Sequence, residues 1–521
     1  MVFSYFSFNQ IIPLIPSIII LALAVVFFRK NKIKLSLVLL FFGAFGLGCF
    51  IALLDPYLHI WDESYHALVA KNLMDNPFYP VLYKIPVLNY DYTLWTDNYI
   101  WLHKQPLFLW QIALSMKIFG INEFSVRLPS VIMHAIIPIF IYRIGKISLN
   151  NKIGFYGALF FSLSYFPLEL ISGVYFTDHN DIAFLFYVTA SFWAWFEYTY
   201  TKKSFWLILI GLFAGCAVLI KWLMGLLVFI CWAFTFFSER QKMLQWRTYT
   251  PFIKSVLISM FVFIPWQIYI LCRFPVESKY EFPIISSRLF KVLDGHGGNF
   301  WYHFEATRIL YGSGLLVSFL LIFSLVVLFK KLNSINYRIF IISAILFVYL
   351  LYSIAATKSL AYCIIVSPLI YLGFSALFIT AINYFEKKHF KNIVKNSFFY
   401  VLLSLICFFI IDMKDIQINH TMYKPSENED RIKKLAEKSL INNLDNILPD
   451  KKYIIFNTNF AQGGNIPFMF YTDYIAYRCI PSKEQCEEVI RKGYKIAILD
   501  FNNLPDYIIY DENIIKIPIT Q

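Results

Sequence analysis

Charged side chains beside long apolar runs are the residues of this 521-residue chain whose types could do chemistry. The carboxylates among them are the pair Asp62-Glu63 and the residues Asp178 and Asp181. A positioned carboxylate can act as a general base toward a weak nucleophile such as a hydroxyl. The cations and histidines suit an anionic ligand, and they are His103, Lys104, Lys221, His296, His303 and Lys358. Because charge close to a membrane is costly, each of them is a candidate functional residue.

The carboxylates and Lys104 also have structural explanations. Asp62-Glu63 could start an amphipathic helix, because acidic side chains favour a helix N-terminus. Asp178 and Asp181 could cap the helix that follows them. Lys104 could be a lysine that snorkels to the membrane surface.

The remaining candidates are weighed in the same way. His296 precedes two glycines, which is also typical of an ordinary flexible loop, and Lys358 could be a positional anchor. Lys221 is harder to explain structurally, because it lies between two apolar runs. A lone cation there needs a partner, a lipid phosphate or a snorkelling route.

The composition indicates a polytopic membrane protein. Apolar residues make up 59% of the chain and charged residues only 15%, against roughly 25% charged residues in soluble proteins. A water-soluble fold could not bury so much apolar surface, and intrinsic disorder is excluded for the same reason. The formal charge of +13 lies mainly in short loops between apolar runs. A nucleic-acid partner is therefore not expected, because it would need the basic residues on one soluble face.

We predict about twelve membrane-spanning helices, each of roughly 20 apolar residues. Basic residues concentrate in alternate loops, which makes those loops cytoplasmic by the positive-inside rule. Both termini then face outward. The two runs on either side of Lys221 are short and could form one bent element. The predicted spans are 11–28, 35–54, 127–147, 152–171, 182–200, 205–220, 222–237, 250–271, 311–329, 338–356, 361–383 and 396–412.

The long segments lie on the opposite, outer side of this topology. They are 55–126, 172–181, 272–310 and the tail after about residue 412. Two stretches of the first segment, near 62–75 and 106–119, are predicted to be helices at the membrane interface. Except for Lys221, the candidates fall on this outer side. That layout suits an enzyme that handles an anionic lipid headgroup and an external acceptor.

The tail is predicted to be a small α/β unit outside the membrane. A charged helix (427–444) precedes a strand (451–456), and a helix (482–492) precedes a second strand (494–501). This order is typical of a parallel sheet. Cys479 and Cys486 could form a disulfide or remain two free thiols. The predicted organisation is an extra N-terminal transmembrane helix (1–34), a catalytic membrane domain with external loops (35–412) and the external α/β domain (413–521).

Three segments of the first external loop resemble a known family. They are WDESYHALVAKNLM (61–74), LHKQPLFLW (102–110) and FGINEFSVRLPS (119–130). They are similar to the membrane glycosyltransferases with the GT-C fold, in the branch that joins lipid A aminoarabinose transferases and protein O-mannosyltransferases. Further similar segments are GLFAGCAVLIKW (211–222), PWQIYILCRFP (265–275), HGGNFWYHF (296–304) and ATKSLAYCIIVSPL (356–369). The family's Lys-Pro-Pro element is here Lys104-Gln105-Pro106, and His103 stands where members often have an acid.

The resemblance implies an activity and a set of roles. It implies inverting transfer of a sugar from a polyprenyl-phosphate donor to the hydroxyl of a glycan, lipid A or protein, outside the cytoplasmic membrane of a bacterium. Asp62 matches the family's general base, and Glu63 and Asp181 are the other catalytic candidates. The family has one aspartate in the second external loop, and Asp181 is preferred over Asp178 as its match. The expected phosphate ligands are Lys104, Lys358, Tyr65, Tyr362 and Lys221, and the expected substrate contacts are Asp178, His103, His296 and His303.

No cofactor is expected, since the chain has no nucleotide-binding fingerprint. The Asp and His residues are compatible with a divalent metal, but no ligand spacing requires one. A transporter or flippase for a lipid-linked sugar is the alternative, supported by Lys221. A membrane sensor whose tail binds a ligand would not explain the ordered external motifs.

Overall fold

The computed structural model describes residues 8–175, 178–238, 245–312, 315–420, 429–459 and 463–519. The chain divides into two compact units. The first, called the membrane unit, comprises residues 1–52, 130–172 and 179–419, and the second, called the external unit, comprises 53–129, 173–178 and 420–521. The start of the predicted tail helix, at 427–428, lies outside the described residues.

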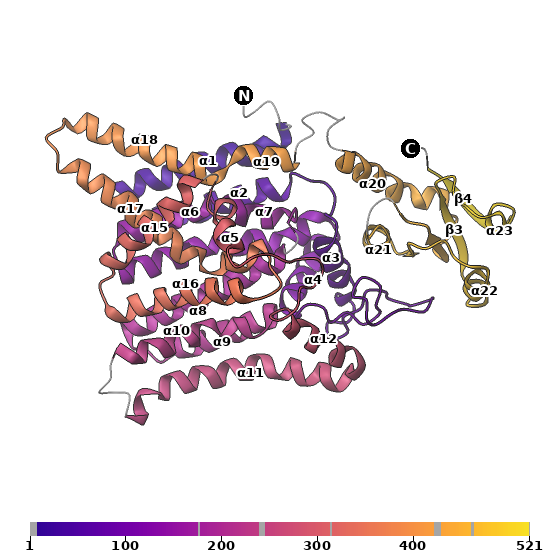
Figure 1. The fold of residues 1–521 in the computed structure, drawn as a ribbon. Coiled ribbons are helices and arrows are strands. Elements are labelled where there is room, and N and C mark those ends of the chain that lie inside the picture. Colours follow the sequence, from indigo (N-terminus) through magenta and orange to yellow (C-terminus); the bar gives the residue numbers. More distant parts are fainter. Residues whose placement is uncertain are drawn as a thin grey trace. The chain divides into compact units, whose positions relative to one another are not determined.

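The membrane unit consists of helices, most of them apolar (Figure 1). Each predicted span has a helical counterpart, although 205–238 forms a single broken helical run. The helices are α1 (Phe8–Arg29), α2 (Ile33–Ala52), α5 (Glu123–Ser148, whose first turns belong to the external unit), α6 (Asn151–Ser162), α7 (Tyr165–Ser172), α8 (His179–Thr201), α9 (Phe205–Lys221), α10 (Leu227–Thr235), α11 (Thr250–Arg273), α12 (Pro275–Ser287), α13 (Tyr302–Glu305), α14 (Thr307–Leu310), α15 (Leu315–Lys331), α16 (Ile335–Ile354), α17 (Ser367–Glu386), α18 (Asn392–Ile411) and α19 (Met413–His420). Short 3₁₀ segments join several of them, at Trp222–Leu226, Phe236–Ser238, Trp246–Thr248 and Leu360–Val366.

Eight helical runs among the described residues are long and apolar enough to cross a membrane. A ninth is added if α6 and α7, which meet at a bend of 41°, form one span. Helix α8 and the 17-residue α15 do not meet this test of length and composition. The chain is thus a multi-pass membrane protein, and the count of twelve spans stays a prediction.

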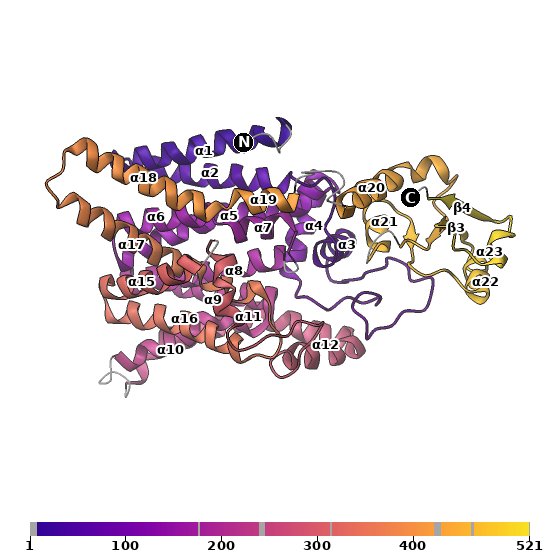
Figure 2. The ribbon, with the colours of Figure 1, turned by 45° about the horizontal axis from the view of Figure 1, so that its top comes forward.

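Close helix contacts in the membrane unit use small residues. At Gly145 of α5, an added Cβ would lie 2.5 Å from the Cα of Gly154 in α6. Small residues allow such backbone approach where apolar burial gives little drive for association in lipid. Figure 2 shows the long helices of this unit running side by side.

The external unit combines two parts of the chain that are distant in sequence. Its first part carries α3 (Asp62–Leu73) and α4 (Leu107–Phe119), at the two stretches that the sequence indicated. Residues 63–73 of α3 are all buried. The tail supplies the rest, which are α20 (Glu429–Ile447), β1 (Tyr453–Phe456), α21 (Asn465–Tyr471), β2 (Ile475–Ala476), α22 (Lys483–Arg491), β3 (Lys495–Asp500), α23 (Asp506–Ile509) and β4 (Ile514–Pro518).

The four strands form a parallel sheet in the order β2-β1-β3-β4. In its register Ile454 of the central β1 lies between Ile475 and Ile496. The predicted strands at 451–456 and 494–501 are confirmed as β1 and β3, and α22 confirms the predicted helix. The sequence did not predict β4. Cys479 and Cys486 are both free thiols.

Lys71 of α3 ties the first part of the external unit to the tail. Its ammonium group donates to the backbone carbonyls of Met469 (2.9 Å), Phe470 (3.0 Å) and Thr472 (2.6 Å). These carbonyls end α21, where a helix carries its negative partial charge. The contact therefore fixes α3, the helix that begins with the catalytic candidate Asp62, against the α/β tail.

Candidate functional site

Asp62 and Lys104 form an ion pair in the external unit. Asp62 is the first residue of α3, and Lys104 lies just before α4. Lys104 Nζ is 3.2 Å from Asp62 Oδ2, and their side chains are 20% and 13% exposed. Trp61, immediately before the helix, has a φ of 65°, a left-handed conformation that costs energy for a bulky residue and clusters at functional sites. The pair is therefore held in place yet accessible to a small ligand.

Aromatic rings surround this ion pair. The ring of His103 stacks on that of Trp95 with centroids 4.8 Å apart. Tyr65 lies edge-on to the same indole at 4.9 Å, and Trp61 is 6.1 Å from it. Tyr65 also donates a hydrogen bond of 3.4 Å to the carbonyl of Thr96. Sequence reasoning missed Trp95, which lies between the matched motifs.

The pKa of Asp62 is lowered to about 2. Burial alone would raise it, but the charge of Lys104 and smaller contributions from His66 and His103 outweigh that effect. Asp62 is therefore a carboxylate throughout the neutral range, which is the form that can accept a proton.

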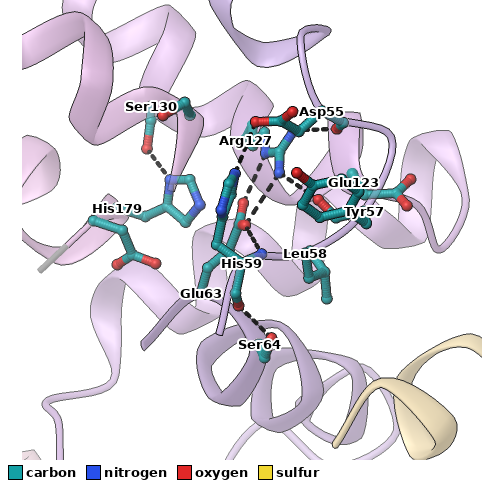
Figure 3. Close-up of polar contacts among 12 residues, drawn as sticks. Asp55, Tyr57, Leu58, His59, Glu63, Ser64, Glu123, Arg127, Ser130 and His179 are labelled. Carbon is teal, nitrogen blue, oxygen red and sulfur yellow. Dashed lines mark hydrogen bonds and ion pairs between the residues drawn. The ribbon is translucent and has the colours of Figure 1, made fainter. Parts of the chain in front are cut away.

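Glu63 points away from solvent and pairs with Arg127 (Figure 3). Arg127 Nε and Nη2 lie 2.7 Å and 3.1 Å from its two carboxylate oxygens. The same guanidinium donates to the carbonyls of Asp55 and Tyr57, each at 2.7 Å. Glu63 also accepts the backbone N–H of His59 at 2.6 Å. These contacts fix the chain that enters α3, and a catalytic role for Glu63 stays a prediction.

Asp178 meets a histidine that the sequence interpretation did not single out. Its Oδ1 lies 3.0 Å from Nδ1 of His66, and both side chains are fully buried. His66 follows Asp62 by four residues on α3, so it lies one helical turn along the same face. That spacing was the available signal for His66.

Asp181 and Lys221 form a second ion pair, in the membrane unit. Asp181 lies in the first turn of α8, and Lys221 is the last residue of α9. Lys221 Nζ is 2.5 Å from Asp181 Oδ1 and 5.1 Å from the centre of the Tyr362 ring. Lys221 thus has the partner that its position between apolar runs requires.

Lys358 and two histidines lie in the same unit. Lys358 Nζ donates to the carbonyls of Tyr352 (2.9 Å) and Ser353 (2.7 Å) at the end of α16, and its backbone N–H donates to the carbonyl of His296 (2.8 Å). The buried ring of His303 lies 6.3 Å from that of Tyr362.

The predicted site residues thus fall into two groups. The external unit contains Asp62, Glu63, Tyr65, His103, Lys104 and Asp178, and the membrane unit contains Asp181, Lys221, His296, His303, Lys358 and Tyr362.

A further cluster offers metal-ligating atoms. Asp55, His59 and His420 each place one such atom within 4.8 Å of the others. Burial lowers the pKa of His59 well below its usual value, so its ring is neutral, as a metal ligand must be. Arg431 also binds Asp55, and a cation would compete with that guanidinium.

Comparison with known proteins shows that the fold is of the GT-C type. Residues 103–269 match the family model described as dolichyl-phosphate-mannose-protein mannosyltransferase. An undecaprenyl phosphate-alpha-4-amino-4-deoxy-L-arabinose arabinosyl transferase of Photorhabdus laumondii is 24% identical over 247 residues, which are 46% of this chain and 42% of that protein. A protein of Aquifex aeolicus without an assigned function is 29% identical over 170 residues, 32% of this chain and 30% of that one. The chain therefore matches less than half the length of these curated relatives.

Solved structures agree with this classification. ArnT from Cupriavidus metallidurans, in its crystal structure bound to undecaprenyl phosphate, has a TM-score of 0.61 at 13% identity over 88% of each chain. The archaeal oligosaccharyltransferase AglB from Archaeoglobus fulgidus, in complex with an inhibitory peptide and a dolichol-phosphate, has a TM-score of 0.54 at 11% identity, over 89% of this chain and 69% of AglB. The predicted resemblance to the GT-C glycosyltransferases and the predicted fold class are confirmed.

Proposed function

We propose that the protein is a membrane glycosyltransferase that moves a sugar from a polyprenyl-phosphate donor to an acceptor hydroxyl. The ion pair between Asp62 and Lys104 carries the proposal, because it places a base and a phosphate-binding cation 3.2 Å apart. The family match begins at residue 103, beside this pair. The solved neighbours bound to undecaprenyl phosphate and dolichol-phosphate support a lipid-phosphate donor.

In the proposed reaction the acceptor oxygen attacks the anomeric carbon in a single displacement. The bond from that carbon to the phosphate oxygen breaks, its electron pair stays on the phosphate, and the configuration inverts. Asp62 takes the proton of the acceptor hydroxyl, and Lys104 neutralises the charge that develops on the phosphate. No other reactant is needed.

The same pair links donor binding to base strength. Without a ligand, Lys104 is the first cause that lowers the pKa of Asp62. When a phosphate attracts Lys104, that influence weakens and the pKa of Asp62 rises. A carboxylate of higher pKa is a stronger base, so the donor would activate the base that uses it.

The other candidates receive proposed roles from the resemblance of their sequence motifs to the GT-C glycosyltransferases. Lys221, Lys358, Tyr362 and Tyr65 are proposed phosphate ligands, and Asp181 and Glu63 are reserve candidates for the base. The proposed substrate contacts are His103, Asp178, His296 and His303. No resident cofactor is proposed.

The proposed location is the cytoplasmic membrane of a bacterium, with both termini and the external unit on its outer side. The proposed acceptors are lipid A, another glycan or a protein. The basic residues of the alternate loops support this orientation.

The proposal is tested with the purified full-length chain in nanodiscs and a panel of undecaprenyl-phosphate pentoses and hexoses. We expect transfer from one donor to an acceptor in an extract of the source envelope, and loss of the same sugar from glycans, glycoproteins or lipid A of a deletion strain, both read by mass spectrometry. Movement of the lipid across the bilayer without transfer would instead favour a flippase.

A further inference from the structure

A pocket of about 490 Å³ lies in the external unit, in the size range of small-molecule sites. One wall comes from the loop between α3 and α4, and the other comes from the α/β tail. None of the twelve predicted site residues lines it. Its principal lining side chains are Tyr83, Tyr90, Asp97, Asn465, Tyr477 and Arg478.

A buried amide in the wall has an unused acceptor. Asn465, the first residue of α21, is only 2% exposed. Its Nδ2 donates to the hydroxyl of Tyr83 at 3.0 Å, whereas its Oδ1 has no hydrogen-bond partner among the described residues. A buried acceptor without a partner carries the full cost of its lost hydration. A ligand that donates a hydrogen bond would recover this cost.

Tyrosine rings form the apolar part of the wall. Tyr83 and Tyr477 stack with centroids 5.2 Å apart. The hydroxyl of Tyr477 accepts the backbone N–H groups of Val87 and Leu88, each at 3.1 Å. The ring positions are therefore fixed without any ligand. Tyr90, 43% exposed, lies at the rim with its ring 5.5 Å from that of Tyr99.

The polar part of the wall carries no net charge. Asp97 and Arg478 contribute one carboxylate and one guanidinium, and the other polar side chains are amides, tyrosine hydroxyls and the thiol of Cys479. An amide both donates and accepts hydrogen bonds, as a sugar hydroxyl does. Because the charges of Asp97 and Arg478 offset each other, the wall as a whole favours neither a net anion nor a net cation, and an uncharged sugar matches both the polar groups and the ring faces.

The pocket wall is connected to the helix that begins with Asp62. Tyr65 of α3 bonds to the carbonyl of Thr96, and Thr96 directly precedes Asp97 of the wall. An added Cβ at Gly463 would lie 3.5 Å from the Tyr65 ring. Segments next to the pocket wall therefore contact the helix that carries the proposed base.

We propose that this pocket binds an uncharged saccharide of the acceptor, so that the tail selects which glycan receives the sugar. This inference rests on the proposed glycosyltransferase function and adds the substrate class to it. The acceptor is then a neutral glycan rather than a bare protein side chain or a charged lipid headgroup.

The test measures binding of the full-length chain in nanodiscs to immobilised oligosaccharides, without a donor. The probes are neutral gluco-, manno- and galacto-oligosaccharides, with phosphorylated, amino and acidic oligosaccharides and a serine/threonine-rich peptide for comparison. We expect a neutral oligosaccharide to be retained and at least tenfold weaker binding in Tyr90→Ala and Arg478→Gln. The matched controls Tyr510→Ala and Arg491→Gln, at exposed residues of the same unit, should bind as the native chain does.

A third variant, Asn465→Leu, tests the unused acceptor, and its fold is checked by gel filtration. Retention of only charged oligosaccharides or the peptide, no retention of any probe, or native-like binding by Tyr90→Ala and Arg478→Gln would each overturn the inference. Binding of undecaprenyl phosphate and sugar transfer are measured separately in the same nanodiscs. If the pocket binds a glycan but the chain neither binds the donor nor transfers sugar, the proposed function is refuted and the pocket assignment stands. If the chain transfers sugar but glycan binding does not depend on the pocket, the pocket assignment is refuted and the proposed function stands.

Discussion

Replacing Lys104 by Met should raise the pKa of Asp62. The carboxyl has a pKa of about 2 against an ordinary 3.8. At 1.36 kcal/mol per pKa unit, its neighbours favour the ionised form by roughly 2–3 kcal/mol net of burial. Lys104 is the first of the lowering influences, and burial opposes it. Without that ammonium group the pKa should rise to at least its ordinary 3.8, because burial then acts with less opposition.

The sign of the effect on rate follows from the role of the base. Above its pKa Asp62 is ionised and active, and below it the rate falls about tenfold per pH unit. Native enzyme should therefore show no acid limb from Asp62 in kcat/KM between pH 4 and 8. In Lys104→Met, kcat/KM should fall with decreasing pH below about pH 4 to 5. The variant should also bind the donor more weakly at every pH.

The assay is single-turnover transfer from the undecaprenyl-phosphate sugar identified as donor, followed from pH 4 to 8 at donor concentrations far below saturation, so that the rate reports kcat/KM of the free enzyme. Lys104→Arg is the matched control, because it keeps the charge and should keep the limb below pH 4. Identical acid limbs in the Met and Arg variants would refute the assignment of Lys104 as the group that holds Asp62 ionised.

Three further predictions concern the frame of the site. Arg127→Met leaves Glu63 buried without its guanidinium, so stability should fall by about 3–5 kcal/mol; a native thermal unfolding midpoint would contradict this. Gly173→Ala forces a Cβ onto a φ of +83° and against the Glu63 carboxylate, so it should lower the midpoint more than Gly493→Ala, where φ is +81° but no atom is nearby. Burial raises the pKa of Glu437 to about 7 from 4.5, so folding loses stability as pH rises from about 4.5 to 7. Glu437→Gln should therefore stabilise the protein by about 1–3 kcal/mol at pH 8 and hardly at pH 4, and equal gains at both pH values would contradict it.

The helices of the membrane unit were predictable because their signal is local. An apolar run of about 20 residues is enough to identify a span, and each predicted run has a helical counterpart. The strands β1 and β3 were predictable for a similar reason, since their apolar residues are consecutive. Strand β2 has two residues and β4 follows a short helix, so their pairing depends on a sheet edge that no local pattern encodes.

The sequence was enough to identify candidate site residues, but it did not show which side chains contact one another. Motif spacing identified Asp62 and Lys104, which the fold brings together across 42 residues. It did not indicate that Glu63 is bound by Arg127 or that Asp178 is bound by His66. Those contacts join segments 64 and 112 residues apart, and buried partners of this kind are fixed by tertiary packing. The pocket at Asn465 escaped the sequence interpretation because no charged residue marks it within the motifs.

The most direct test of the central claim is single-turnover transfer by Asp62→Asn. The variant keeps the size and most of the hydrogen bonding of Asp62 but cannot accept a proton near neutral pH. Asp75→Asn is the matched control, at an exposed carboxylate in the same external segment. Donor binding is followed separately with undecaprenyl phosphate. We predict native folding and lipid binding with transfer at least roughly a hundredfold slower, and unchanged transfer by the control; near-native transfer by Asp62→Asn would contradict Asp62 as the base.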